Sequence, residues 1–218
     1  PEEILSQNVE DLQNYKLSDN FDSKHTVYLY PERIVRSIGG TNTFFDGVYM
    51  CAAAAGFLSS QQNVAIPLTN KALSGFSILR DRVFRDITLN ALGGEGATVV
   101  QPISGGGLVL AGRTTSQSGL IEDEEISIIF IRNKVKSVLR TSLSSYIGKI
   151  QDDNTFTAIT VKVKSIMQAL VGQNVIEKVG PIKVERDKVD PRQINVVLSF
   201  VPTYPINYAF IDIEVGLS

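Results

Sequence analysis

The sequence is poor in the side chains that most often carry chemistry. Its 218 residues contain one cysteine, one histidine and no tryptophan. Cys51 alone cannot form an internal disulfide or a cysteine-based metal cage, and we expect a small buried thiol on an apolar helix. His25 has no Cys or carboxylate at metal-ligand spacing beside it, and no G-x-S-x-G serine is present to partner it. We therefore expect no catalytic residue, no metal site and no enzyme.

Neither sign of charge dominates. There are 21 Lys and Arg against 23 Asp and Glu, for a net charge of -2. A nucleic-acid binder needs a clustered excess of cations, so we expect no nucleic-acid partner. The most apolar run, residues 44–58, is broken by Asp46 and is shorter than the roughly 20 residues of a bilayer span, so we expect no membrane insertion. The chain begins at Pro1 without a signal-type segment, and we expect a piece of a longer protein.

None of three glycine-containing stretches has the sequence context of a phosphate-binding loop. Residues 93–96 follow a predicted helix and lead into a strand, which is the reverse of the order that points backbone N–H groups at a phosphate. The run at 105–107 has Leu110 in place of a third glycine, and Gly148-Lys149 is followed by Ile150 where a P-loop needs Ser or Thr. All three are interpreted as turns, and no cofactor is expected. The alternative function is a small-molecule or nucleotide-binding α/β protein that uses residues 104–107 beside Arg113.

Hydrophobic spacing and turn residues predict alternating helices and strands in the first part of the chain. Ala52 to Ala55 favour a tightly packed helix over residues 45–59, because small side chains let another backbone approach. The other expected elements are helices over 5–16 and 83–92, strands over 26–30, 76–79, 97–101 and 108–111, and a turn over 67–70. This order indicates a mixed α/β segment.

The second part of the chain carries two long helical patterns followed only by strands. The first pattern has a β-like start over 126–129 and an apolar stripe running to Ile150. The second covers 156–170, with Asn154 or Thr155 as its cap and Gly172 at its end. Strands are expected over 182–185, 194–201 and 208–215. The fold class is therefore mixed α/β, with an α/β segment over 1–112 followed by a two-layer α+β lobe over 113–218.

Two charge patterns flank the start of the first long helix. The acidic run 122–125 is interpreted as a solvated cap that complements the helix dipole. Arg132, Lys136 and Arg140 recur every four residues, and like charges at that spacing destabilise an isolated helix. Carboxylates from elsewhere in the fold can neutralise this stripe, or it can contact an acidic partner molecule. The sequence leaves both possibilities open.

The last predicted strand is the second candidate contact surface. Ala209, Ile211, Ile213 and Val215 share one face, and Phe210, Asp212 and Glu214 share the other. Such a strand can complete its own sheet or add to the open edge of a neighbouring copy through main-chain hydrogen bonds. The candidate interface residues are Tyr208, Phe210, Ile211, Asp212, Ile213, Glu214 and Val215.

The order of several short motifs resembles the C-terminal region of contractile tail sheath proteins. The small-residue run at 46–56 and the Pro67-Leu68-Thr69 turn resemble consecutive motifs of that family. Further along, residues 89–92 with 96–100 and the glycine-led strand 107–113, which ends in Arg113-Thr114, continue the same order. The family commonly has Trp in this last motif, where this chain has Leu110.

The resemblance implies a structural subunit of a phage tail or a related contractile injection system. Residues 1–112 would be the C-terminal part of the main α/β sheath lobe, and 113–218 the C-terminal α+β sheath lobe. Copies would form hexameric rings stacked helically around a tail tube protein, and the virion's sheath would contract to drive the tube through a cell envelope. The resemblance also implies assembly in the host cytoplasm, without a cofactor. Residues 208–215 would pair with a neighbour, and Arg132, Lys136 and Arg140 would face the tube or an adjacent subunit.

Overall fold

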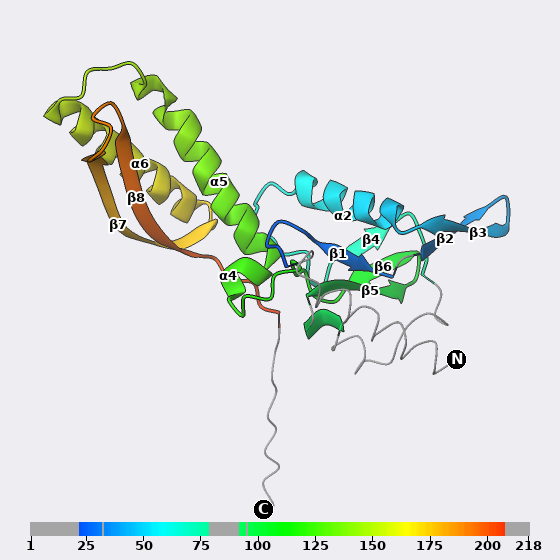
Figure 1. Cartoon of the computed structure of the whole chain (residues 1–218). Coiled ribbons are helices and arrows are strands. Elements are labelled where there is room, and N and C mark those ends of the chain that lie inside the picture. The colour runs from blue at the N-terminus through cyan, green and yellow to red at the C-terminus, as the bar shows by residue number, and fades with distance from the viewer. Residues whose placement is uncertain (1–21, 32, 79–91, 95, 208–218) are drawn as a thin grey trace, which may run out of the picture.

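The computed structural model describes residues 22–31, 33–78, 92–94 and 96–207, which form two lobes in chain order (Figure 1). The first lobe combines small sheets with one exposed helix, and the second packs two long helices against a two-stranded sheet. The mixed α/β class predicted from the sequence is confirmed. The helix expected over 5–16, and all but the end of the one over 83–92, lie outside the described residues.

The first lobe is organised around a four-stranded sheet with the order β1-β5-β6-β4. Strand β1 runs parallel to β5, whereas β5, β6 and β4 are joined antiparallel. Buried Leu68, Leu73, Val100 and Val109 form its apolar core, together with Met50 from the helix above. The strands are β1 (Tyr28–Tyr30), β4 (Ala72–Ser74), β5 (Ala97–Ile103) and β6 (Gly106–Val109).

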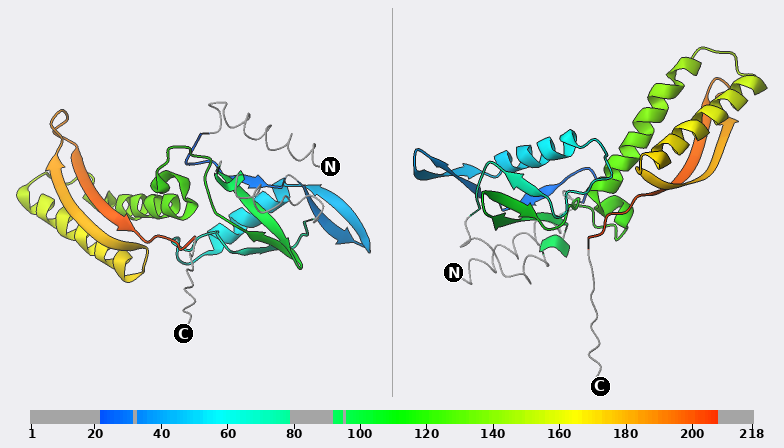
Figure 2. Two further views of the ribbon diagram at one scale, coloured as in Figure 1. Left: turned by 90° about the horizontal axis from the view of Figure 1, so that it is seen from below. Right: turned by 180° about the vertical axis from the view of Figure 1, so that it is seen from behind.

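A hairpin that was not predicted from the sequence projects from this lobe (Figure 2). It joins β2 (Arg33–Ile38) to β3 (Thr41–Asp46) through Gly39 and Gly40, whose φ angles of 59° and 82° suit a two-residue hairpin turn. Of the strand expected over 76–79, the structure describes residues 76–78, and the prediction is wrong for these, because they form a single bridge, from Ser77 to Val35.

The small-residue helix α2 (Val48–Ser60) starts later than predicted, because residues 45 and 46 belong to β3. Asp46 accepts a hydrogen bond from the backbone N–H of Val48 at 3.0 Å, which marks the helix start. Only Met50 and Ala54 are buried, so the expectation of a tightly packed helix is wrong for its outer face. Cys51 lies on that face and is exposed, which also corrects the expected buried thiol.

The helix α5 (Ile126–Leu143) links the two lobes. Its first residue, Ile126, packs in the core of the first lobe, whereas Ile131 and Val135 pack in the core of the second. The β-like start predicted over 126–129 is wrong, because these residues are the first turn of the helix. Residues 126–129 are all buried, so their hydrophobic pattern lacks the 3.6-residue period of a helix with one buried face and resembles that of a strand. The division at residue 112 stays a prediction.

The second lobe stacks α6 (Asp153–Gly172) on a hairpin of β7 (Ile176–Arg186) and β8 (Ile194–Pro202). The helical spacing of Ile159, Val163, Met167 and Leu170 is confirmed as the buried face. The cap is Asp152 and not Asn154 or Thr155, since its carboxylate accepts from the Thr155 N–H at 2.7 Å. Hydrogen bonds with Thr155 lower the pKa of Asp152.

Candidate assembly surface

The predicted terminal strand cannot be placed. Its candidate interface residues lie outside the part of the chain that the structure describes, so pairing with a neighbour stays a prediction. Those residues are Tyr208, Phe210, Ile211, Asp212, Ile213, Glu214 and Val215.

The basic stripe of α5 divides into two parts. Arg132, near the start of the helix, forms an ion pair with Asp123 at 3.0 Å and donates to the backbone carbonyl of Glu122 at 3.3 Å. Lys24 reaches the same carboxylate at 3.4 Å. Burial alone would raise the pKa of Asp123, but hydrogen bonds from Arg132 and Lys24 lower it below its usual value. Of the two possibilities that the sequence left open, neutralisation by a carboxylate of the same chain therefore applies to Arg132.

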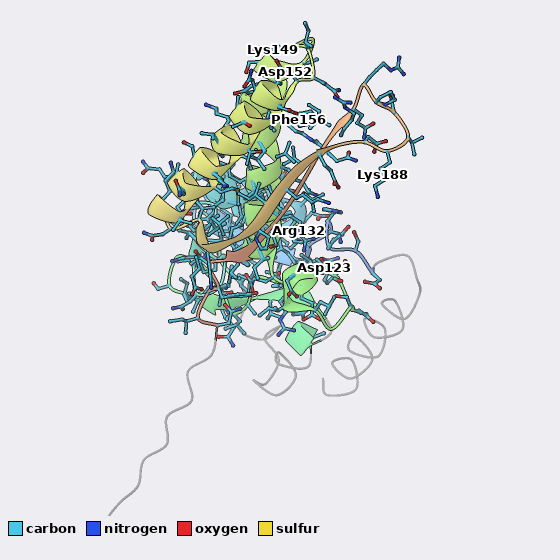
Figure 3. The ribbon with its side chains drawn as sticks, turned by 90° about the vertical axis from the view of Figure 1, so that its left-hand side faces the viewer. Asp123, Arg132, Lys149, Asp152, Phe156 and Lys188 are labelled. Carbon is cyan, nitrogen blue, oxygen red and sulfur yellow. The ribbon has the colours of Figure 1, made fainter. Side chains whose placement is uncertain are left out.

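Lys136 and Arg140 lie one and two turns further along and are exposed. Both line an open groove of about 570 Å³, whose rim also includes Lys149 and Arg192. Lys149 and Lys188 stand at the end of the lobe remote from Arg132 (Figure 3). Among the described residues, no carboxylate lines the groove. Its apolar wall consists of Leu139, Leu143, Tyr146, Ile147, Ile159, Ile194, Val196 and Leu198.

The groove exists because the sheet is too narrow to cover both helices. The β7–β8 hairpin packs along α6, where four apolar residues are buried. On α5, no residue after Val135 is buried, although Leu139 and Leu143 continue the apolar stripe. On β8, alternate residues from Ile194 to Leu198 face the groove. Apolar side chains from three elements thus remain half-exposed.

The strand β8 is hydrogen-bonded to β7 alone within the described residues. Within that part of the chain, no strand pairs with its outer edge, whose N–H and C=O groups are in register for another strand. A strand added there would lie beside the groove. The geometry thus combines free main-chain hydrogen-bonding groups with an uncovered apolar surface rimmed by cations.

The glycines at 105–107 serve the first-lobe sheet. Gly105, with φ of 77°, forms the turn between β5 and β6. A Cβ on Gly106 would lie 2.1 Å from the carbonyl oxygen of Leu73, and one on Gly107 would lie 2.4 Å from Val100. Arg113 follows the opposite end of β6, where it approaches Glu124 at 3.9 Å and donates to Gly93. No helix N-terminus follows this loop, so its geometry gives no support to the nucleotide-binding alternative.

The described ranges contain no helix that is long and apolar enough to cross a bilayer. Within the same ranges, no three His, Cys, Asp or Glu residues are grouped to hold a metal ion.

Known proteins resemble this chain in sequence and in structure. No family model matches the chain. The tail sheath protein of Mycobacterium phage Bxz1 is 26% identical over 172 residues, which are 78% of this chain and 29% of that protein. Among solved structures, the contracted sheath complex of the PVC extracellular contractile injection system matches with a TM-score of 0.76. That match has 12% identity and covers 94% of this chain and 60% of the other. The chain has the contractile tail sheath fold.

Two further structures carry the same sheath fold. The contracted helical sheath of the anti-feeding prophage matches with a TM-score of 0.73 and 14% identity, over 90% of this chain and 59% of that one. The sheath tail protein of Desulfitobacterium hafniense matches with a TM-score of 0.65 and 13% identity, over 83% and 46%. The chain spans less than a third of the curated relative and at most about 60% of these sheath chains.

Proposed function

We propose that the chain is part of a structural subunit of a contractile tail sheath. Copies join as hexameric rings stacked helically around a tail tube, and the sheath contracts to drive the tube through a target cell envelope. The sheath fold supports this assignment. The observation that carries it is the groove beside the outer edge of β8, where half-exposed apolar side chains lie next to main-chain groups that another chain can pair with. The subunit is a component of a virion or a similar particle, assembled in the host cytoplasm.

Residues 208–215 of another copy are the proposed occupant of this surface. Their backbone can extend the sheet at the edge of β8, where main-chain hydrogen bonds give affinity. Their apolar face, with Ile211 and Ile213, can cover the half-exposed side chains of α5. Asp212 and Glu214 lie on the opposite face of such a strand and make the segment acidic as a whole. Among the described residues, the charged side chains that line the groove are all cations, of which Arg192 pairs with Asp190 at 3.0 Å. Each copy would thus be linked to the next without covalent bonds.

Deletion of residues 208–218 tests this link. Negative-stain imaging and sedimentation should show tubes or stacked rings for the intact chain and none for the shortened one. Melting should stay unchanged, because every residue of the described cores precedes the deletion. The full-length variant Ile211→Asp/Ile213→Asp should also fail to assemble, since it removes the apolar face only. Assembly of either variant at the parental level would contradict the proposed strand exchange. A parent chain that stays strictly monomeric would count against the sheath function.

Lys136 and Arg140 are proposed to face an acidic partner, either the tail tube protein or an adjacent subunit. Both are exposed, and neither has a carboxylate among the residues that line the groove. Arg132 was predicted to make the same contact, but its guanidinium already pairs with Asp123, so it has less charge to offer a partner. The role requires no cofactor, nucleic acid or membrane insertion, and it assigns the chain no catalytic activity. Work would come from a metastable extended lattice that gains contacts on contraction.

A further inference from the structure

A short strap connects the second lobe to residues beyond 207. After β8 ends at Pro202, the Thr203 hydroxyl donates to the carbonyl of Asn174 at 3.1 Å, and its N–H donates to Val175 at 3.4 Å. The strap then leaves the second lobe and continues to the corner between α4 (Ile121–Glu124) and α5, as Figure 1 shows. There the Asn207 side-chain amide donates to Glu125 Oε2 at 2.8 Å. Between these ends Ile206 is 88% exposed, so the strap is held at its two ends.

The carboxylate that receives the strap is buried. Glu125 is only 2% exposed, which corrects the prediction that the acidic run 122–125 is solvated throughout. Its Oε1 accepts from the Ser127 hydroxyl at 3.1 Å, which leaves Oε2 for Asn207. Burial raises the pKa of Glu125, and hydrogen bonds from Asn207 and Ser127 partly offset that effect. A buried carboxylate is unfavourable unless it is hydrogen-bonded, so this one depends on a residue 82 positions away.

The hydrogen bond at Asn207 limits the positions from which the residues after 207 can start. A free chain of five residues has a root-mean-square reach of about 12 Å, so release at Asn207 would let the departure point wander over that range. With the amide bound, the departure point is fixed beside the first turn of α5. Pre-organising a binding segment strengthens association, because less chain freedom is lost on binding. A hydrogen bond suits this purpose, because its angular preference also restricts the orientation of the Asn207 side chain.

We propose that the Glu125–Asn207 pair is a clasp that sets the point and direction from which the residues after 207 leave the subunit, and so positions them to join another copy. The inference rests on the proposed sheath function, in which residues 208–215 form that link. Glu125 and Asn207 are thus positioning residues: neither has to touch the neighbouring copy.

Exchanging the two polar groups tests the clasp. Asn207→Asp places a second carboxylate against Glu125 and should release the strap by repulsion. Adding Glu125→Gln to that variant restores one donor and one acceptor in the opposite order, while Ser127 can still donate to the remaining oxygen. Asn154→Asp, an exposed position at the start of α6, is the matched control for the added charge.

Two measurements are made on the full chain. A spin label at Ile206→Cys, in a Cys51→Ser background, should become more mobile in Asn207→Asp and return to its parental mobility in the double variant. The lowest concentration that gives assemblies should rise about tenfold in Asn207→Asp, which is about 1.4 kcal/mol of lost association free energy, and recover in the double variant. The control should match the parent in both.

The outcomes separate the two proposals. If the parent assembles and Asn207→Asp assembles at the same concentration, the clasp is wrong and the sheath function stands. If the double variant regains neither assembly nor immobility, the defect is not due to the exchanged pair and the clasp is also wrong. If the parent forms no assemblies under any condition, both the sheath function and the positioning role are contradicted.

Discussion

Gly106→Ala should destabilise the chain by about 2–4 kcal/mol, because the added carbon has no space. Its position would lie 2.1 Å from the carbonyl oxygen of Leu73, which is a backbone atom in the neighbouring strand and cannot rotate away. In the antiparallel register Gly106 stands opposite Ser74, so relief of the clash requires β4 and β6 to separate. Urea denaturation followed by circular dichroism should show a clearly lower midpoint.

Gly56→Ala is the matched control for this substitution. Gly56 lies within α2, with no atom within 4 Å of the added carbon, and its φ is not in the left-handed region. Alanine favours the helix over glycine, so stability should rise by about 0.5–1 kcal/mol. Opposite signs for the same chemical change would identify close backbone approach as the cause. Equal midpoints for Gly106→Ala and the parent would contradict the tight β4–β6 contact.

Helices that rest on a single surface were predictable from the sequence. The spacing of Ile159, Val163 and Met167 gave the right face of α6, because that helix is covered on one side only. The start of α5 was misread because Ile126 and its neighbours are buried on several sides. The β2–β3 hairpin could have been predicted from Gly39-Gly40, because two glycines between strand-forming residues are typical of a two-residue hairpin turn.

The candidate site was predictable only in part. The four-residue repeat of Arg132, Lys136 and Arg140 places all three on α5, and a contact of Lys136 and Arg140 with a partner stays a prediction. Local spacing could not show that Asp123 neutralises Arg132. The groove depends on how far a two-stranded sheet reaches across two helices, which is a property of tertiary packing. Glu125 likewise looked like part of a solvated acidic cap, because its partner Asn207 is remote in the sequence.

Reversing the charge of Lys136 and Arg140 should strongly weaken assembly without affecting the fold. In Lys136→Glu/Arg140→Glu, the rim loses two positive charges and gains two negative ones beside a groove proposed to receive an acidic segment. Opposed like charges at an interface cost several kcal/mol, so association should weaken by at least about 100-fold, or about 2.7 kcal/mol. Both side chains are exposed, and the melting temperature should therefore stay close to that of the parent.

Lys134→Glu/Lys162→Glu provides the control, since it changes the net charge equally at exposed helix positions that do not line the groove. Sedimentation over a range of salt concentrations should show assembly of the parent and the control, with parental assembly weakening as salt rises. Loss of assembly in both double variants would indicate a general effect of net charge. Assembly of Lys136→Glu/Arg140→Glu at the parental concentration would show that these cations do not face an acidic partner, and the groove would then act through its apolar wall and the open edge of β8 alone.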